Sequence, residues 1–327
     1  MRRREFLGVL GGAAVWPLAA RSQQPAVPVI GFLGSASPVA FMDRLQAFRR
    51  GLAETGFVEG RNVGIEFRWA NNQLDQLPRL AEELVQQRVN VIAAPGNTAA
   101  AVAARAATTT IPIVFYIAGD PIQLGFVESL SRPGGNLTGV TNLQVELGAK
   151  QLELLHGILP RAHSFGLLVN PTNRGVAENL VEAVQGAAVT RGLQVHALWA
   201  SAERDFNAVF DQTRQLQASG LIISSDAFFT SQVEQLANLV LQHRLPAVYP
   251  FHEFARAGGL MTYGASNTEA YRQAGVYTGR ILKGEKASDL PVQQATKVEL
   301  VINLKTAGAL GLDLPAGLLA RADEVIE

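Results

Sequence analysis

The chain has 327 residues, of which 48% are hydrophobic and 17% charged, a composition typical of a soluble globular protein of two domains. Lys plus Arg and Asp plus Glu each number 28, so no basic field exists to bind nucleic acid or anionic lipid. The absence of cysteine excludes disulfides, thiol nucleophiles, thiolate metal sites and a lipid-modified N-terminal cysteine. We therefore expect no nucleic-acid partner and no lipid anchor.

Residues 1–22 are typical of a signal peptide. An arginine-rich start precedes an apolar stretch from Leu7 to Ala20, which is shorter than the ~20 apolar residues of a membrane span. The run Arg3-Arg4-Glu5-Phe6-Leu7 resembles the twin-arginine export signal of bacteria. An ordinary secretory signal with clustered basic residues is the alternative. We expect cleavage after Ser22 and a soluble mature protein in the periplasm.

Strands and helices alternate over the first half of the mature chain. Strands are predicted at 29–33, 62–69, 89–95 and 113–117, from short apolar or alternating runs. Helices are predicted at 42–55 and 74–87, and Asn97 and Thr98 open an alanine-rich helix after the Pro95-Gly96 turn. Such alternation specifies a parallel sheet with helices on both faces.

The pattern then repeats. A strand is predicted at 165–170, a helix at 174–191 and a strand within 192–200. Trp199 lies 130 positions after Trp69, and Ile222 lies 130 after Ile92. The segment LPAVYP at 245–250 similarly follows IPIVFY at 111–116 by 134 positions. The spacing predicts two copies of one α/β lobe, two similar Rossmann-like lobes with parallel sheets.

Glycine-rich segments end each copy and predict where the chain crosses between the lobes. GGNLTGVTN (134–142) precedes a helix at 147–159, and GGLMTYGAS (258–266) precedes a helix at 269–283 that returns to the first lobe. A last strand is predicted at 298–302. We expect the first lobe to comprise 26–142 plus 265–293 and the second 143–264 plus 294–327. Ligands bind beyond the carboxyl ends of parallel strands, so the facing lobes predict a central cleft.

Four segments carry a family resemblance: GLAETGFVEGRNVGIEFRWA, DPIQLGFVESLSRPGGNLTGVTN, FHEFARAGGLMTYG and the C-terminal KVELVINLKTAGALGLDLP with LLARADEVIE. They resemble the substrate-binding proteins of ABC transporters, in the family that contains tryptophan-binding members. The resemblance covers the chain from about Val29 to its end. It implies a type I periplasmic-binding fold with three interlobe crossovers, hinge closure around a ligand, and a membrane permease with separate ATPase subunits. We expect the protein to be a monomer.

Small and polar residues follow the strands of the first lobe. Ligand-binding candidates there are Ser35, Ser37, Gly96, Asn97, Thr98, Gly119 and Asp120. Amides at a helix N-terminus attract a carboxylate by about 0.3–1 kcal/mol, so this edge is expected to hold the anionic end of a small ligand. The alternatives are structural: the serines, Asn97 and Thr98 as helix caps, and Asp120-Pro121 as the start of a turn or helix.

At the second lobe, Asp226 is the candidate for binding a ligand ammonium. The following helix is predicted to have its own capping box in Ser231-x-x-Glu234, so Asp226 is not required as its cap. A local turn-forming role, or acceptance from a ligand hydroxyl, is the alternative. Further candidates are the polar neighbours Asn142, Asn170 and Asn173, and the aromatic residues Tyr116, Phe229 and Phe251, which could flank a flat ligand or belong to the core.

Three segments are expected to absorb the hinge rotation: Thr141-Asn142, Tyr263-Gly264 and the stretch from Val292 to Thr296. Trp69 and Trp199 occupy matched strand positions and are interpreted as structural.

No enzyme motif is present. The sequence lacks G-x-G-x-x-G after a strand, a phosphate-binding G-K-[ST] loop and a G-x-S-x-G elbow, and its five histidines lack metal-ligand spacing. We expect no catalytic residue, metal or cofactor. The predicted function is capture of a small carboxylate-bearing ligand by an ABC importer, an amino acid, with aromatic ones among the candidates. The alternatives are an exported two-lobe hydrolase or transferase, with His252-Glu253 as its acid/base pair, and a ligand-sensing domain.

Overall fold

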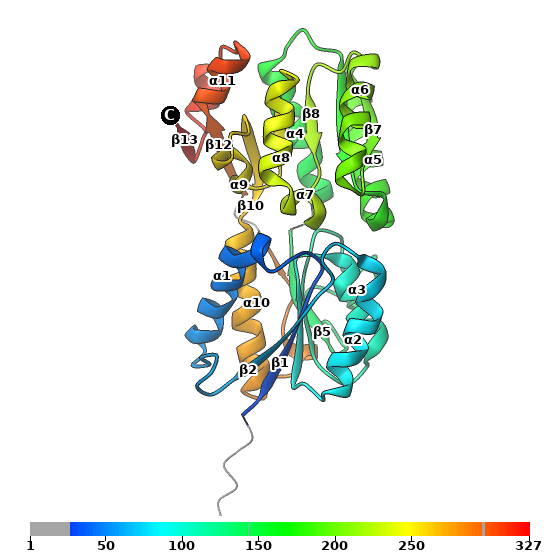
Figure 1. The fold of residues 1–327 in the computed structure, drawn as a ribbon, viewed down its shortest axis with the longest axis vertical. Helices are drawn as coiled ribbons and strands as arrows, with labels where there is room; N and C mark the ends of the chain where they lie inside the picture. Colours follow the sequence, from blue (N-terminus) through cyan, green and yellow to red (C-terminus); the bar gives the residue numbers. More distant parts are fainter. Residues whose placement is uncertain (1–26, 143, 296–297) are drawn as a thin grey trace, which may run out of the picture.

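The computed structural model describes residues 27–142, 144–295 and 298–327. The signal peptide expected at 1–22 lies outside these residues. Two α/β lobes are stacked along the long axis of the molecule (Figure 1). Within the described ranges, no helix combines the length and apolar character needed to cross a membrane.

The first lobe contains a six-stranded parallel sheet in the order β11-β5-β4-β3-β1-β2. Its strands are β1 (Val29–Gly34), β2 (Gly64–Trp69), β3 (Val91–Pro95), β4 (Ile113–Ile117), β5 (Leu137–Thr141) and β11 (Gln293–Gln294). Its helices are α1 (Met42–Glu54), α2 (Leu77–Gln86), α3 (Thr98–Ala107) and α10 (Asn267–Leu282), with 3₁₀ turns η1 (Val39–Phe41), η2 (Leu74–Gln76) and η5 (Ala287–Asp289).

The second lobe contains a seven-stranded sheet in the order β13-β12-β10-β9-β8-β6-β7. Its strands are β6 (Ser164–Val169), β7 (Gln194–Trp199), β8 (Leu221–Ile223), β9 (Ala247–Tyr249), β10 (Met261–Ala265), β12 (Val298–Asn303) and β13 (Glu324–Ile326). Its helices are α4 (Gln144–Ile158), α5 (Arg174–Val189), α6 (Phe206–Gln215), α7 (Ala227–Ser231), α8 (Val233–Gln242), α9 (His252–Arg256), α11 (Leu304–Leu310) and α12 (Ala316–Leu319), with 3₁₀ turns η3 (Pro171–Asn173) and η4 (Glu203–Asp205).

The two lobes repeat one topology. The order β2-β1-β3-β4-β5 in the first sheet matches β7-β6-β8-β9-β10 in the second, and every pair within these runs is parallel. Strands β2 and β7 begin and end 130 positions apart. The prediction of a duplicated α/β lobe is confirmed.

The chain passes between the sheets three times, as predicted. It crosses after β5 into α4, returns after β10 into α10, and crosses again between β11 and β12. Strand β12 departs from the expected parallel arrangement. It enters from the cleft, where Val298 pairs with Ala265 at the end of β10, and therefore runs back antiparallel to β10.

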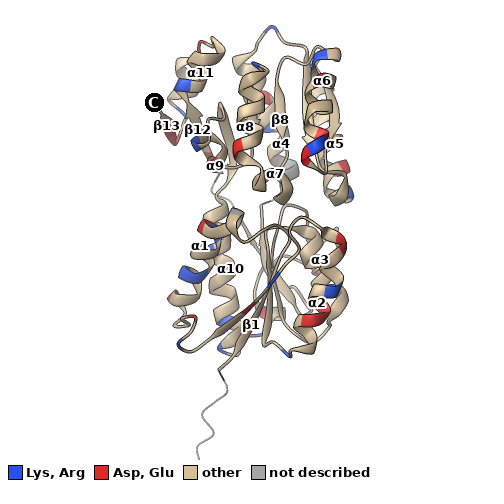
Figure 2. Cartoon of the chain, viewed as in Figure 1, with Lys and Arg blue, Asp and Glu red and all other residues tan. Residues whose placement is uncertain are grey.

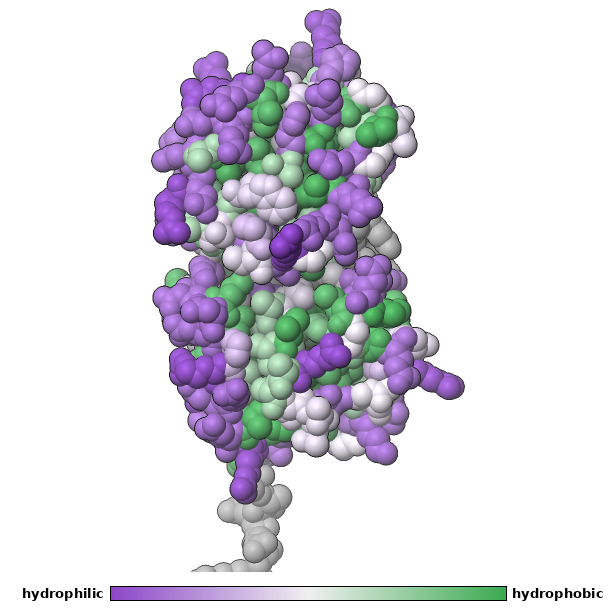
Figure 3. Space-filling view, turned by 90° about the vertical axis from the view of Figure 1, so that its right-hand side faces the viewer, coloured by the Kyte–Doolittle hydropathy of each residue, from purple (hydrophilic) through white to green (hydrophobic). Residues whose placement is uncertain are grey.

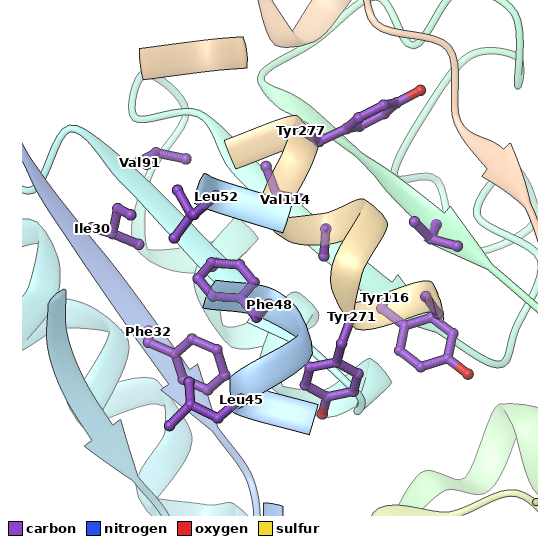
Figure 4. Close-up of a cluster of buried hydrophobic side chains, with 14 of the residues drawn as sticks. Ile30, Phe32, Leu45, Phe48, Leu52, Val91, Val114, Tyr116, Tyr271 and Tyr277 are labelled. Atoms are coloured by element: carbon purple, nitrogen blue, oxygen red, sulfur yellow. The ribbon is translucent and has the colours of Figure 1, made fainter. Parts of the chain in front are cut away.

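Helices cover both faces of each sheet and enclose four apolar cores. Figure 4 shows one of them, in which Phe32 of β1 and Phe48 of α1 lie near Tyr271 of α10. Helices α1 and α10 approach each other closely at glycine positions. A Cβ atom on Gly275 would lie 2.1 Å from the Phe48 carbonyl oxygen, and one on Gly51 would lie 1.9 Å from that of Arg272. The two helices, far apart in sequence, lie side by side in Figure 1.

Charged residues of both signs are distributed over both lobes (Figure 2). The face turned toward the viewer in Figure 3 narrows to a waist where the lobes meet, and apolar surface is concentrated on the first-lobe side of that waist.

Candidate functional site

A small cavity lies between the lobes. Its walls come from the carboxyl ends of β3, β4 and β5 in the first sheet and of β6, β8 and β9 in the second, with the segments that follow them, together with η1, α1 and α10. This is the edge at which open parallel sheets bind ligands. The lining residues are Phe41, Arg44, Gly96, Asn97, Thr98, Tyr116, Ile117, Ala118, Asn142, Asn173, Ser225, Asp226, Ala227, Thr230, Phe251, Asn267 and Tyr271.

The start of α3 forms one wall of the cavity. Gly96 has a φ of +94°, and a Cβ atom there would lie 2.1 Å from the Tyr271 hydroxyl, so this position requires glycine. Asn97 is the N-cap of α3, because its Oδ1 accepts from the Ala99 amide at 2.7 Å. The buried Oγ1 of Thr98 has no hydrogen-bond partner within the described part of the chain. The wall therefore presents a free hydroxyl at a helix N-terminus.

A chain of three side chains lines a second wall. Asn142 Nδ2 donates to the Tyr116 hydroxyl at 3.2 Å, and that hydroxyl donates to Asn267 Oδ1 at 2.8 Å. Burial raises the pKa of Tyr116, so the hydroxyl keeps its proton. Asn142 Oδ1 is buried and has no partner among the described residues. Thr98 and Asn142 thus leave one hydroxyl and one acceptor unused at the cavity.

Asp226 lies on the opposite side, in the second lobe. Its Oδ1 accepts from the Phe228 amide and from Asn170 Nδ2, both at 2.8 Å, and it is the N-cap of α7. Burial raises the pKa of Asp226, and these hydrogen bonds only partly oppose that rise.

The expected capping box at Ser231 and Glu234 is wrong. Ser231 Oγ donates to the Phe228 carbonyl at 2.7 Å, and the N-cap of α8 is Gln232, which makes no side-chain capping bond. The structure contains an additional helix, α7, which has five residues and is capped by Asp226 itself. Asp226 therefore both caps α7 and lines the cavity.

Arg44 is a buried cation that sequence reasoning missed. It lies on α1 with its side chain 6% exposed, its Cζ stands 4.5 Å from the centroid of the Phe41 ring, and its Nη2 lies 3.2 Å from Glu253 Oε1 of the second lobe. Burial raises the pKa of Glu253, but the charges of Arg44 and His252 hold it below its usual value. The only hint in the sequence is that Arg44 directly precedes Leu45, which belongs to the apolar face of α1.

Six of the twelve predicted site residues line the cavity: Gly96, Asn97, Thr98, Asn142, Asp226 and Phe251. Asn170 stands behind them, with its Nδ2 on Asp226. The wall also includes residues the sequence reasoning did not select, among them Asn267 and Tyr271. The hydrophobic periodicity of the sequence does not identify these two residues as cavity residues. They lie at the start of α10, and they reach the cavity because this helix returns to the first lobe.

The remaining five candidates lie elsewhere. Phe229 is fully buried in the second-lobe core, where its ring packs 5.5 Å from that of Phe228. Asp120 Oδ1 accepts from the Ile122 amide at 2.8 Å, so its structural alternative holds, and it lines an outer groove with Gly119. Ser35 and Ser37 follow β1 but do not line the cavity. The cavity wall contains the aromatic rings of Phe41 and Tyr271, and Phe229 does not contribute to it.

The two lobes are closed on each other. Besides the Arg44–Glu253 ion pair, Asn72 Nδ2 donates to Ser231 Oγ at 3.2 Å across the cleft. Ala227 of the second lobe packs into a core cluster of the first. Of the expected hinges, Thr141 ends β5, whereas Tyr263 and Gly264 lie inside β10; Thr296 lies outside the described residues.

The opposite pKa shifts of two capping carboxylates lead to a prediction about stability. An unfolded Asp has a pKa of about 3.9, so a raised folded pKa destabilises the protein at neutral pH and has no effect below about pH 3.9. Asp226→Asn should therefore raise the free energy of unfolding in urea at pH 7, with the gain disappearing in acid.

Asp205 is the matched control. The amides of Ser201 and Ala202 donate to its Oδ2 at 2.9 Å each and, against burial, lower its pKa. Asp205→Asn should destabilise the protein at pH 7 and lose its effect as the pH falls through the folded pKa. Equal signs for the two variants would contradict the assignment.

Comparison with known proteins identifies the family of the chain. The family model described as ABC transporter substrate binding protein matches residues 30–326. A tyrosine-binding protein of Clostridioides difficile (strain R20291) is 26% identical over 269 residues, 82% of this chain and 76% of that protein. An ABC domain from Streptococcus pneumonia in complex with L-Trp is 24% identical with a TM-score of 0.83, over 91% of this chain and 99% of that one.

A ligand-free, open substrate-binding protein from Clostridium difficile is also 24% identical, over 92% of this chain and 99% of that one, with a TM-score of 0.65. The two sheets, their crossovers and the match over residues 30–326 lead to one conclusion: the chain belongs to the family of ABC transporter substrate-binding proteins.

Proposed function

We propose that this solute-binding protein captures a free amino acid, with aromatic ones preferred, and delivers it to the permease of an ABC importer. The observation that carries the proposal is the pair of unused polar atoms at the cavity, Thr98 Oγ1 as a donor and Asn142 Oδ1 as an acceptor. A ligand that is anionic at one group and cationic at the next satisfies both.

The first lobe offers two sources of positive potential for a carboxylate. One is the N-terminus of α3 with the Thr98 hydroxyl, a type of site that stabilises an anion by about 0.3–1 kcal/mol and by up to about 2 kcal/mol when partly buried. The other is the guanidinium of Arg44, which also lines the cavity. A ligand carboxylate is therefore the group we assign to this lobe.

The second lobe contributes the buried carboxyl of Asp226. The amides of Phe228 and Phe229 and the side chain of Asn170 donate to this carboxyl, whose two oxygens have about four acceptor positions, so it retains acceptor capacity. A ligand ammonium at this wall would offset the cost of burying an ionised carboxylate. The charges of the cavity thus complement an α-amino acid with its carboxylate on the first lobe and its amine toward the second.

Aromatic rings form the apolar part of the wall. Tyr116 and Tyr271 pack edge to face with ring centroids 5.8 Å apart, and Phe41 lies 6.2 Å from Tyr271. Each ring that packs against a flat side chain would add about 0.5–1.5 kcal/mol. The tyrosine-binding and L-Trp-bound relatives support an aromatic amino acid. The pair named for the enzyme alternative is in contact, with His252 Nδ1 3.3 Å from Glu253 Oε2, but neither residue lines the cavity and Glu253 is also paired with Arg44.

A thermal-shift screen tests the ligand class. We expect L-tyrosine, L-tryptophan or L-phenylalanine to raise the unfolding midpoint, because ligand at about 100 times Kd stabilises the folded state by about 2.7 kcal/mol. The screen includes the other amino acids, amine-free aromatic acids, and arabinose and inositol as neutral controls. Stabilisation by the sugars alone, or by no compound, would overturn the proposal.

Ligand binding should be coupled to closure through the Arg44–Glu253 ion pair. A hydrogen bond between charged groups contributes about 1.5–3 kcal/mol, so Glu253→Gln should lower affinity for the identified amino acid about tenfold or more. Small-angle scattering should show that this variant needs more ligand to reach the compact radius. Glu285→Gln, which breaks an ion pair with Arg280 inside the first lobe, is the control and should match the parent. Identical ligand dependence in all three proteins would contradict the coupling.

We also propose that the protein is exported to the periplasm by the twin-arginine route and cleaved after Ser22. The basis is the sequence of residues 1–22. Replacing both Arg3 and Arg4 by Lys should leave the tagged full-length precursor in the cytoplasm, whereas Arg2→Lys should not. Export of both variants would assign the signal to the general secretory route, and cytoplasmic parent protein would refute export.

A further inference from the structure

We infer that Asn142, oriented by Tyr116, is the residue with which the cavity selects ligands that carry an amine over the corresponding hydroxy acids. The inference rests on the proposed function and deepens it, because it names the ligand group that the site requires. It does not depend on which amino acid side chain is bound.

The hydrogen bonds of the Asn142–Tyr116–Asn267 chain run in one direction. The Tyr116 hydroxyl has a single proton, which it donates to Asn267 Oδ1. It can therefore only accept from Asn142, and the nitrogen of that amide is the atom that faces it. The Asn142 oxygen is left buried and without a partner among the described residues, and Asn142 lines the cavity.

A donor count separates the ligand classes. Two acceptors belong to residues of the cavity wall: Asn142 Oδ1, which has no partner among the described residues, and the Asp226 carboxylate, which already accepts from Asn170 and Phe228. An ammonium has three protons and can donate to both, whereas a hydroxyl has one and a methylene has none. A hydroxy acid can donate to only one of the two groups and places no positive charge beside Asp226, and an amine-free acid also leaves Asn142 Oδ1 unsatisfied. Affinity should fall in that order.

The chain of side chains also holds Asn142 in place. Asn142 directly follows β5 and Asn267 begins α10, so they lie at the first and second crossovers, and Tyr116 of β4 joins them. Figure 4 shows Tyr116 and Tyr271 near each other at one end of the first-lobe core. One of the two acceptors for the amine, Asn142, therefore belongs to the first lobe, as Thr98 does, and the other, Asp226, belongs to the second.

The test compares ligand pairs on the mature chain by isothermal titration. The probes are L-tyrosine, L-tryptophan, L-phenylalanine and L-leucine, each with its 2-hydroxy acid and its amine-free analogue. For the amino acid that binds, the parent should prefer the amine over the hydroxyl by at least tenfold. Tyr116→Phe, which frees the Asn142 amide to turn, should reduce that preference at least fivefold.

Tyr249→Phe is the matched control. Its hydroxyl is also fully buried and has no partner in the described structure, but it lies in the second-lobe core away from the cavity. Its removal should leave both affinities within twofold of the parent. Should Tyr116→Phe fail to fold, Asn142→Leu replaces it, since it removes the acceptor at similar volume and should abolish most of the preference.

The outcomes are distinguishable. If no amino acid binds, the proposed function fails and the inference fails with it. If an amino acid binds but its hydroxy acid binds within twofold, the inference alone is overturned. It is also overturned if the preference is as large in Tyr116→Phe or Asn142→Leu as in the parent and in Tyr249→Phe.

Discussion

Each lobe is built on five parallel strands, β1 to β5 in the first and β6 to β10 in the second, whose carboxyl ends lie at one edge of the sheet, and this edge faces the other lobe. Polar residues that follow different strands, such as Thr98 and Asp226, are thereby brought to the same gap, whatever their distance in sequence. The chain must also leave each lobe from that edge, because β5 and β10 end there. Crossover segments and ligand-facing residues therefore coincide, as Asn142 illustrates.

Closing this gap places charges in an apolar setting, which is costly unless partners are supplied. Arg44 and Glu253 pair across the lobes, and Asp226 is held by Asn170 and the start of α7. Thr98 and Asn142 have hydrogen-bonding atoms left over. The polar groups where the lobes meet thus have hydrogen-bond or ion-pair partners, whereas those at the position of the solute have bonding atoms left over. These unused atoms favour the ligand-bound state of the closed protein.

Much of the fold could be predicted from the sequence, because strand order follows from alternating strands and helices and the 130-residue offset marks the duplication. Short elements were harder. The five-residue α7 has too few positions for a periodic signal, so the cap at Asp226 and the burial of Phe229 were both misjudged. The direction of β12 depends on where the chain re-enters the second lobe, which no local pattern specifies.

The candidate site was predictable only where a residue directly follows a strand, as Gly96, Asn97 and Thr98 follow β3. Arg44 lies on the amphipathic helix α1, where a charged residue is expected to face solvent. Asn267 and Tyr271 reach the cavity because α10 returns to the first lobe. Their positions depend on tertiary packing of segments more than 200 residues apart, such as α1 and α10.

The glycine contacts between α1 and α10 have a kinetic consequence. Because backbone meets backbone at Gly51 and Gly275, the two helices form one rigid block, and Arg44, Asn267 and Tyr271 reach the cavity from that block. The same lobe carries Thr98, Tyr116 and Asn142, so most of the wall is assembled before the lobes meet. A solute arriving at the open protein would first dock on this preformed half. Its association rate would then reflect encounter with the first lobe, and its residence time would be governed by how often the second lobe swings away.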